Sequence, residues 1–284
     1  MATMLTDVHT HSTFSPDGVS SLEEMVAAAV EKNVVFYGVS EHINYDIWIA
    51  QQDGRVPPEK YTDEEEYFHK ARHLQDDYAG VINMLVGAEI GYSDDERAKK
   101  LNRELIEKYS PDFVVNSIHA LEGVDYWNGT TFYEVKGGQK VVRPKEEVYR
   151  EYFALILRSV QADYPYDIIG HIGYAMRYAP YEDRAAKYVD YKQEIDAVLM
   201  EIIKRDKILE VNSSGGKGLS MTLPDEEILQ RYFELGGRKV SFASDAHDTG
   251  RIMDKREQVV EMLKKIGFTY LIVPCKGEHI KVEI

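Results

Sequence analysis

Nine side chains that can bind a metal ion lie just past the ends of successive apolar segments of this 284-residue chain. They are His9, His11, Asp17, His42, Glu89, His119, His171, Asp245 and His247. Histidines that recur at the same point of a strand-then-helix repeat indicate one metal cluster, because imidazole and carboxylate groups are common ligands of zinc and related ions. The pattern predicts a metal-dependent hydrolase.

Two of the motifs place a pair of candidate ligands two residues apart. His9 and His11 end an extended segment, and side chains at i and i+2 of a strand share a face, so both imidazoles can reach one ion. Asp245 and His247 repeat this spacing after the seventh strand. An alternative for this second pair is a serine-dependent catalytic triad. The chain has no Gly-x-Ser-x-Gly nucleophile motif, which argues against that alternative.

The elements that must position these residues alternate between short apolar segments and helices. The expected strands are Leu5–Val8, Val34–Val39, Val81–Ala88, Phe113–Ser117, Asp167–Gly170, Ile208–Val211, Lys239–Ala243 and Tyr270–Val273. The expected helices run from Ser20 or Ser21 to Lys32 and over Asp63–Tyr78, Asp94–Lys108, 145–163, Asp183–Arg205, Pro224–Leu235 and Arg251–Ile266. Such alternation is typical of parallel βαβ units in an α/β protein.

A parallel sheet of this kind can be either open or closed into a barrel. An open, doubly wound sheet concentrates function at one switch point, whereas in a barrel all the strand ends converge. Candidate ligands follow nearly every strand, so we expect a barrel with a metal cluster at the C-terminal face of its strands.

Two segments interrupt the alternation. Residues 43–62 are expected to form a long loop. Residues 120–144 hold four glycines and an aromatic cluster, which predicts an inserted hairpin or lid. Neither a repeat nor a linker divides the chain, so we expect a single domain over residues 1–284.

Composition narrows the class of protein. A net charge of −15 argues against a nucleic-acid partner, because phosphate backbones need a basic surface. A small phosphate ester is compatible with this charge, because bound cations reverse the local field. No apolar run approaches the roughly 18–20 residues of a membrane span. The only cysteine, Cys275, excludes an internal disulfide, and a cytoplasmic enzyme is expected. The oligomeric state is left open.

Over residues 7–247 the chain resembles the polymerase and histidinol phosphatase (PHP) superfamily, and is most similar to its stand-alone histidinol-phosphate phosphatases. The resemblance rests on Asp7-Val8-His9-Thr10-His11, Ser40-Glu41-His42, Gly87-Ala88-Glu89, Ser117-Ile118-His119, Gly170-His171 and Ser244-Asp245-Ala246-His247. It implies a distorted (β/α)7 barrel with three divalent metal ions, which we expect to be zinc, manganese or iron.

The resemblance also implies how the ligands divide. The first ion would be held by His9, His11, Glu89 and Asp245. Glu89 would bridge to a second ion, which His119 and His171 also bind. Asp17, His42 and His247 would hold the third. Some members of the superfamily have histidine in place of Asp17.

The chemistry expected of such a cluster is hydrolysis of a phosphomonoester. Two cations that share Glu89 would lower the pKa of a bridging water and give a hydroxide that attacks phosphorus. Asp17, Asp245 or His247 could assist the leaving group. Arg177 and Lys217 are candidate phosphate-binding residues, because both follow strands at the reactive face. Histidinol phosphatases often have arginine in the loop of Lys217, so this lysine is a departure.

These expectations combine into one predicted activity, the hydrolysis of L-histidinol phosphate to L-histidinol and phosphate in histidine biosynthesis. Acids and aromatic rings that could bind the amine and imidazole follow two of the histidines; they are Asp46, Trp48, Glu122, Asp125, Tyr126 and Trp127. One alternative is a PHP phosphoesterase acting on phosphotyrosine proteins or other small esters. Others are a non-catalytic metal-bound scaffold and a metal-dependent amidohydrolase, which would have a bridging lysine in place of Glu89.

Overall fold

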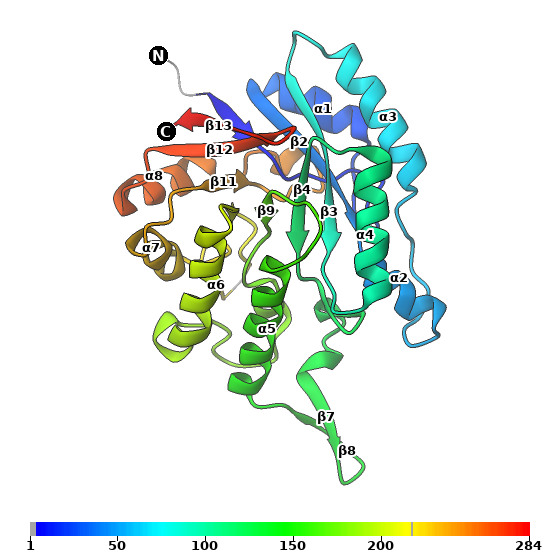
Figure 1. Ribbon diagram of the computed structural model, residues 1–284, viewed down its shortest axis with the longest axis vertical. Coiled ribbons are helices and arrows are strands. Elements are labelled where there is room, and N and C mark those ends of the chain that lie inside the picture. The colour runs from blue at the N-terminus through cyan, green and yellow to red at the C-terminus, as the bar shows by residue number, and fades with distance from the viewer. Residues whose placement is uncertain (1–3, 217) are drawn as a thin grey trace.

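The computed structural model describes residues 4–216 and 218–284, and its centre is a sheet of seven parallel strands (Figure 1). In spatial order these are β1 (Leu5–Asp7), β2 (Val34–Ile43), β3 (Asn83–Gly91), β4 (Phe113–Ser117), β9 (Ile168–Ile169), β10 (Ile208–Asn212) and β11 (Val240–Ala243). Every neighbouring pair is parallel. The α/β prediction is therefore confirmed.

The two outer strands of this sheet approach each other and nearly close it. Val8 N donates to Phe242 O at 3.3 Å, and Asp245 N donates to His9 O at 3.0 Å. The buried Asp7 carboxylate accepts from Ser244 N and Met253 N, each at 3.0 Å, and so ties β1 to the chain that follows β11. The prediction of a (β/α) barrel in place of an open sheet is confirmed.

Helices surround the strands (Figure 1). They are α1 (Leu22–Glu31), α2 (Tyr45–Gln52), α3 (Glu64–Asp77), α4 (Glu96–Tyr109), α5 (Lys145–Val160), α6 (Lys192–Lys204), α7 (Glu226–Glu234) and α8 (Arg256–Ile266). Among the described residues, none of these helices is both long and apolar enough to cross a bilayer.

The expectation of an irregular loop over residues 43–62 is wrong for its first half. Strand β2 continues to Ile43, and α2 begins two residues later. Tyr45, Ile49 and Ala50 are buried at helical spacing. This helix is short and has little amphipathic character, so the sequence pattern does not reveal it.

The start of α6 is also predicted wrongly. The helix begins at Lys192, nine residues after the expected Asp183. The side chain of Asp183 accepts from the backbone N–H of Ala185 at 3.1 Å, a local bond that competes with helix formation.

Two C-terminal strands lie outside the barrel sheet. β12 (Tyr270–Cys275) pairs with β13 (Glu278–Glu283) in an antiparallel hairpin, so the polar tail after the last predicted strand is itself a strand. Ile272, Val273 and Val282 pack in one cluster with Phe113, Ile168 and Ile208, the first residues of β4, β9 and β10. The hairpin thereby covers the N-terminal end of the barrel.

Residues 120–144 form two hairpins joined by 3-10 turns. β5 (Ala120–Leu121) pairs with β6 (Val124–Asp125), and β7 (Tyr133–Lys136) pairs with β8 (Gln139–Val142). The second hairpin projects from the body of the molecule at the bottom of Figure 1. A role of this segment as a lid, and the single-domain organisation, stay predictions.

The interior of the barrel leaves no room for a side chain at Gly87. A Cβ atom built on Gly87 would overlap the Phe113 ring on the adjacent strand. We predict that Gly87→Ala lowers the free energy of unfolding by about 1–3 kcal/mol through overpacking. Urea unfolding checks this, with Gly87→Ala/Phe113→Leu as the control that relieves the overlap. Equal stability of wild type and Gly87→Ala would contradict the packing argument.

Candidate metal centre

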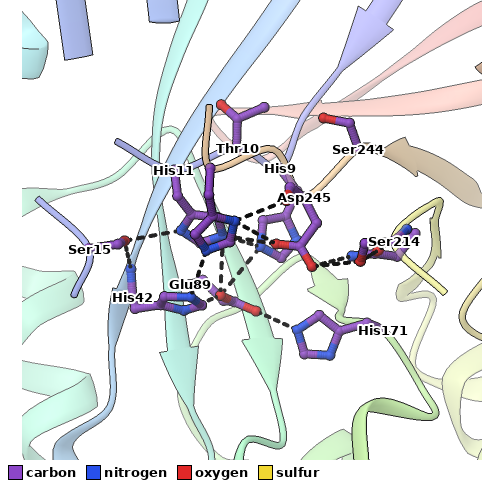
Figure 2. Close-up of polar contacts among 12 residues, drawn as sticks. His9, Thr10, His11, Ser15, His42, Glu89, His171, Ser214, Ser244 and Asp245 are labelled. Carbon is purple, nitrogen blue, oxygen red and sulfur yellow. Dashed lines mark hydrogen bonds and ion pairs between the residues drawn. The ribbon is translucent and has the colours of Figure 1, made fainter. Parts of the chain in front are cut away.

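Glu89 lies at the centre of the predicted cluster, at the C-terminal end of β3, and is fully buried. Its Oε2 atom lies 2.6 Å from His42 Nδ1, 3.3 Å from His9 Nε2 and 3.6 Å from His11 Nε2. Figure 2 shows these imidazoles gathered around the carboxylate. Among the described residues, Oε2 has no partner that satisfies hydrogen-bond geometry. A buried carboxylate oxygen that faces three imidazole nitrogens in this way suits a cation.

The other oxygen of Glu89 faces two more histidines. Oε1 lies 2.8 Å from His171 Nε2 and 3.2 Å from His119 Nε2. Ser117 Oγ donates to the same oxygen at 2.6 Å and orients it. Glu89 therefore presents one oxygen to each of two groups of histidines, which is the arrangement that a bridging carboxylate requires.

Two further carboxylates extend the cluster toward the surface. Asp245 Oδ1 lies 3.3 Å from His11 Nε2 and 3.7 Å from His247 Nδ1. Asp17 Oδ2 lies 3.2 Å from His247 Nε2, and its Oδ1 lies 3.6 Å from His42 Nε2. The structure thus brings all nine predicted side chains into one continuous set of contacts.

The imidazole nitrogens also pair among themselves. The Nε2 atoms lie 3.0 Å apart in His9 and His11, 3.3 Å apart in His119 and His171, and 3.4 Å apart in His42 and His247. Two such nitrogens with adjoining carboxylate oxygens form a donor set that suits zinc, manganese or iron. The residues present therefore fit a cluster of divalent cations.

The charges of these groups depend on one another. Burial opposes ionisation of Glu89, but the neighbouring His119, His9 and His42 outweigh it and hold the pKa of Glu89 well below its usual range. Burial would lower the pKa of His42, yet the charge of Glu89 raises that pKa to about 9. Without metal ions, protons on His9 and His42, whose pKa values are both raised, supply positive charge to the carboxylates. Divalent cations would take the place of these protons.

Glu210 on β10 belongs to the site but was not singled out from the sequence. It is fully buried, lies with its Oε1 2.5 Å from His9 Nδ1, and accepts from the backbone N–H of His171 at 2.7 Å. This contact leaves His9 Nε2 to face Glu89. The sequence feature that could have revealed Glu210 is its position as the one acid within the apolar segment Ile208–Asn212.

Glu41 orders the loop that follows β1. Its carboxylate accepts from the backbone N–H and hydroxyl of Ser12, at 2.9 and 2.6 Å, and from those of Ser15, at 3.0 and 2.6 Å. Ser15 Oγ also lies 3.1 Å from His11 Nδ1. Glu41, which precedes His42 in the sequence, thus positions the turn that leads to Asp17.

Arg177 lies beside the cluster, in the 3-10 turn Tyr174–Tyr178 after β9. One of its terminal nitrogens donates to Ser214 Oγ and lies 3.5 Å from Asp245 Oδ2. Its Nε is buried and has no partner among the described residues. Lys217, the other predicted phosphate-binding residue, lies outside the described residues.

A cavity of about 590 Å³ opens beside the cluster. Asp17, His42 and His119 contribute to its lining, so the cavity reaches the candidate ligands. Its other walls come from α2, from the segment that follows it, from the insertion after β4 and from the 3-10 turn after β9; they include Ile47, Gln51, Glu59, Lys60, Tyr61, Asp125, Trp127, Tyr174 and Tyr178. A small molecule with one end at the cluster can occupy this space.

Comparison with known proteins agrees with this geometry. The PHP domain model matches residues 7–214, which include seven of the nine candidate ligands. The chain belongs to the PHP family. A protein of Clostridium acetobutylicum named "probable histidinol-phosphatase" is 32% identical over 86% of this chain and 87% of its own length. The histidinol-phosphatase of Lactococcus lactis is 28% identical over 92% of this chain and 91% of its own.

Solved structures give the same result for the fold. The crystal structure of histidinol phosphate phosphatase from Lactococcus lactis, complexed with zinc, L-histidinol and phosphate, superposes with a TM-score of 0.78. The match covers 98% of this chain and 99% of that one, at 26% identity. A protein of Listeria monocytogenes superposes with a TM-score of 0.70 at 21% identity, which supports the fold alone.

Removal of metal should reveal the role of Glu89. We predict that a chelator lowers the thermal unfolding midpoint of the wild type and that zinc or manganese restores it, because ligands of the folded state stabilise it. Glu89→Gln, whose side chain has a single acceptor oxygen, should retain less metal per chain. Its unfolding midpoint should also change less when a chelator or metal is added. Elemental analysis and calorimetry measure both effects, with the exposed Glu104→Gln as control. A full metal content in Glu89→Gln would contradict the bridging role.

Proposed function

We propose that the chain hydrolyses L-histidinol phosphate to L-histidinol and phosphate, as a metal-dependent phosphomonoesterase of histidine biosynthesis. The observation that carries this is the match over 98% of the chain to a histidinol phosphate phosphatase in complex with zinc, L-histidinol and phosphate. The continuous cluster of nine ligand-type side chains supports it, because a phosphatase of this kind needs its complete metal-binding set. A biosynthetic role of this kind would place the enzyme in the cytoplasm.

The proposed site holds three divalent cations of zinc, manganese or iron. His9, His11, Glu89 and Asp245 would bind the first, Glu89, His119 and His171 the second, and Asp17, His42 and His247 the third. The three close pairs of Nε2 atoms support this division, since each pair falls within one of the three sets.

When bound, these cations would activate a water molecule as the nucleophile and neutralise the phosphoryl oxygens. Glu89 supplies one oxygen to each side of the cluster, and Glu210 fixes the orientation of His9. Arg177 can turn its guanidinium from Ser214 to two oxygens of a phosphate, a geometry that favours bidentate binding. We also propose Lys217 as a phosphate-binding residue that would add a second positive charge.

The leaving alkoxide must gain a proton, and Asp17, Asp245 and His247 are the candidates. Asp17 lines the cavity and its carboxylate lies 3.2 Å from His247 Nε2. Asp245 is more enclosed, with its side chain 7% exposed against 65% for Asp17. Asp17 is therefore better placed than Asp245 to reach a leaving group in the cavity, while Asp245 contacts His11 and His247.

Steady-state kinetics test the substrate. We predict that kcat/KM for L-histidinol phosphate reaches about 10⁴ M⁻¹s⁻¹ or more, at least about a hundredfold above p-nitrophenyl phosphate and a phosphotyrosine peptide. Phosphate release is measured on protein of known metal content. Equal and slow hydrolysis of all three esters by metal-loaded protein would contradict the assignment of this substrate.

A further inference from the structure

The cavity beside the cluster contains a carboxylate that the hydrolytic chemistry does not use. Asp125 ends strand β6 and lines the same cavity as His42 and His119. It accepts from the backbone N–H of Trp127 at 2.9 Å and from the hydroxyl of Tyr174 at 3.2 Å. These two contacts hold the carboxylate in place at the wall of the cavity.

No lysine or arginine pairs with Asp125 among the described residues. Lys60 is the only such side chain in the described lining of the cavity, and its Nζ donates to Thr13 O at 2.5 Å. Burial raises the pKa of Asp125 to about 7, although the contacts with Trp127 and Tyr174 lower it in part. The carboxylate is therefore a partly desolvated acid whose ionised form has no lysine or arginine partner among the described residues, and a cation that enters the cavity would supply a direct one.

Tyr174 relates this carboxylate to the metal cluster. Its ring lies 5.0 Å from the His119 ring and 5.2 Å from the His171 ring, centroid to centroid, and its hydroxyl reaches Asp125. Asp125 is thus separated from the candidate ligands by one phenol side chain. In the phosphate ester of a 2-amino alcohol, the amine is attached to the carbon next to the ester methylene, so it lies a few bonds from phosphorus.

The other acids of the described lining are less suited to this role. Asp17 contacts His42 and His247 within the cluster. Glu59 lies in the exposed segment after α2, where water screens its charge. The exposed faces of Trp127 and Tyr178 border the same cavity and can contact a flat ring.

We propose that Asp125 binds the ammonium group of the substrate and so selects phosphate esters of 2-amino alcohols over esters that lack the amine. This inference rests on the proposed phosphatase activity and names a residue that determines its specificity. With the phosphate at the cluster, the ammonium would meet Asp125 and the imidazole would lie against the aromatic rings.

The test compares substrates with and without the amine. L-histidinol phosphate, its des-amino analogue 3-(imidazol-4-yl)propyl phosphate and p-nitrophenyl phosphate are assayed with wild type and Asp125→Asn. The asparagine keeps an acceptor oxygen for Trp127 N but has no charge. We expect kcat/KM for L-histidinol phosphate to fall at least about thirtyfold, since a buried partner of a charged group is lost, and the other two substrates to change less than about threefold.

A binding measurement and a control variant distinguish a loss of amine recognition from a general loss of activity. The inhibition constant of L-histidinol should rise in Asp125→Asn, whereas that of the corresponding alcohol without the amine should not. Glu104→Gln, which changes an exposed acid on α4 that does not line this cavity, should leave both constants unchanged. If Asp125→Asn retains the wild-type preference for the amine, or loses activity equally on all substrates, the inference is overturned while the phosphatase proposal stands. If the wild type itself does not prefer L-histidinol phosphate to p-nitrophenyl phosphate, the proposed function fails first.

Discussion

A carboxylate buried inside a protein stays ionised only where positive charge surrounds it, and Glu89 is such a carboxylate. Its two oxygens are reached by five histidines that come from β2 and from the segments after β1, β4 and β9. Strand ends that lie apart in the sequence converge in this way only if the parallel sheet curves into a barrel. The fold and the site therefore meet the same requirement, which is to compensate one central negative charge.

Much of this arrangement could be predicted because its signals are local. All the candidate ligands except Asp17 lie at or just past the end of an apolar strand, so the repeat alone predicts both the barrel and the face on which the side chains gather. The contacts that orient the ligands are different in kind. His9 and Glu210 are 201 residues apart, and no local pattern relates them. Helix α2 and strand β13 were missed for a related reason, since both are short and depend on packing against distant elements.

The cavity beside the cluster has two chemically distinct ends. One end has the histidines and carboxylates that suit cations and, through them, a phosphate. Its wall has Asp125, a carboxylate that pairs with no lysine or arginine among the described residues and lies next to aromatic rings. A substrate with a phosphate at one end and an ammonium a few bonds away is complementary to both, and such complementarity gives specificity more than affinity. Catalysis and selection are thus assigned to different residues of one cavity.

The central claim is that Glu89 joins two metal ions at the convergence of the strands. Anomalous diffraction from crystals of the metal-loaded protein, recorded at the zinc and manganese absorption edges, tests it directly. The account predicts one peak on each side of the Glu89 carboxylate, within coordination distance of its two oxygens, and a third peak among Asp17, His42 and His247. Metal peaks that lie away from Glu89, or a single ion that contacts only one of its oxygens, would contradict it.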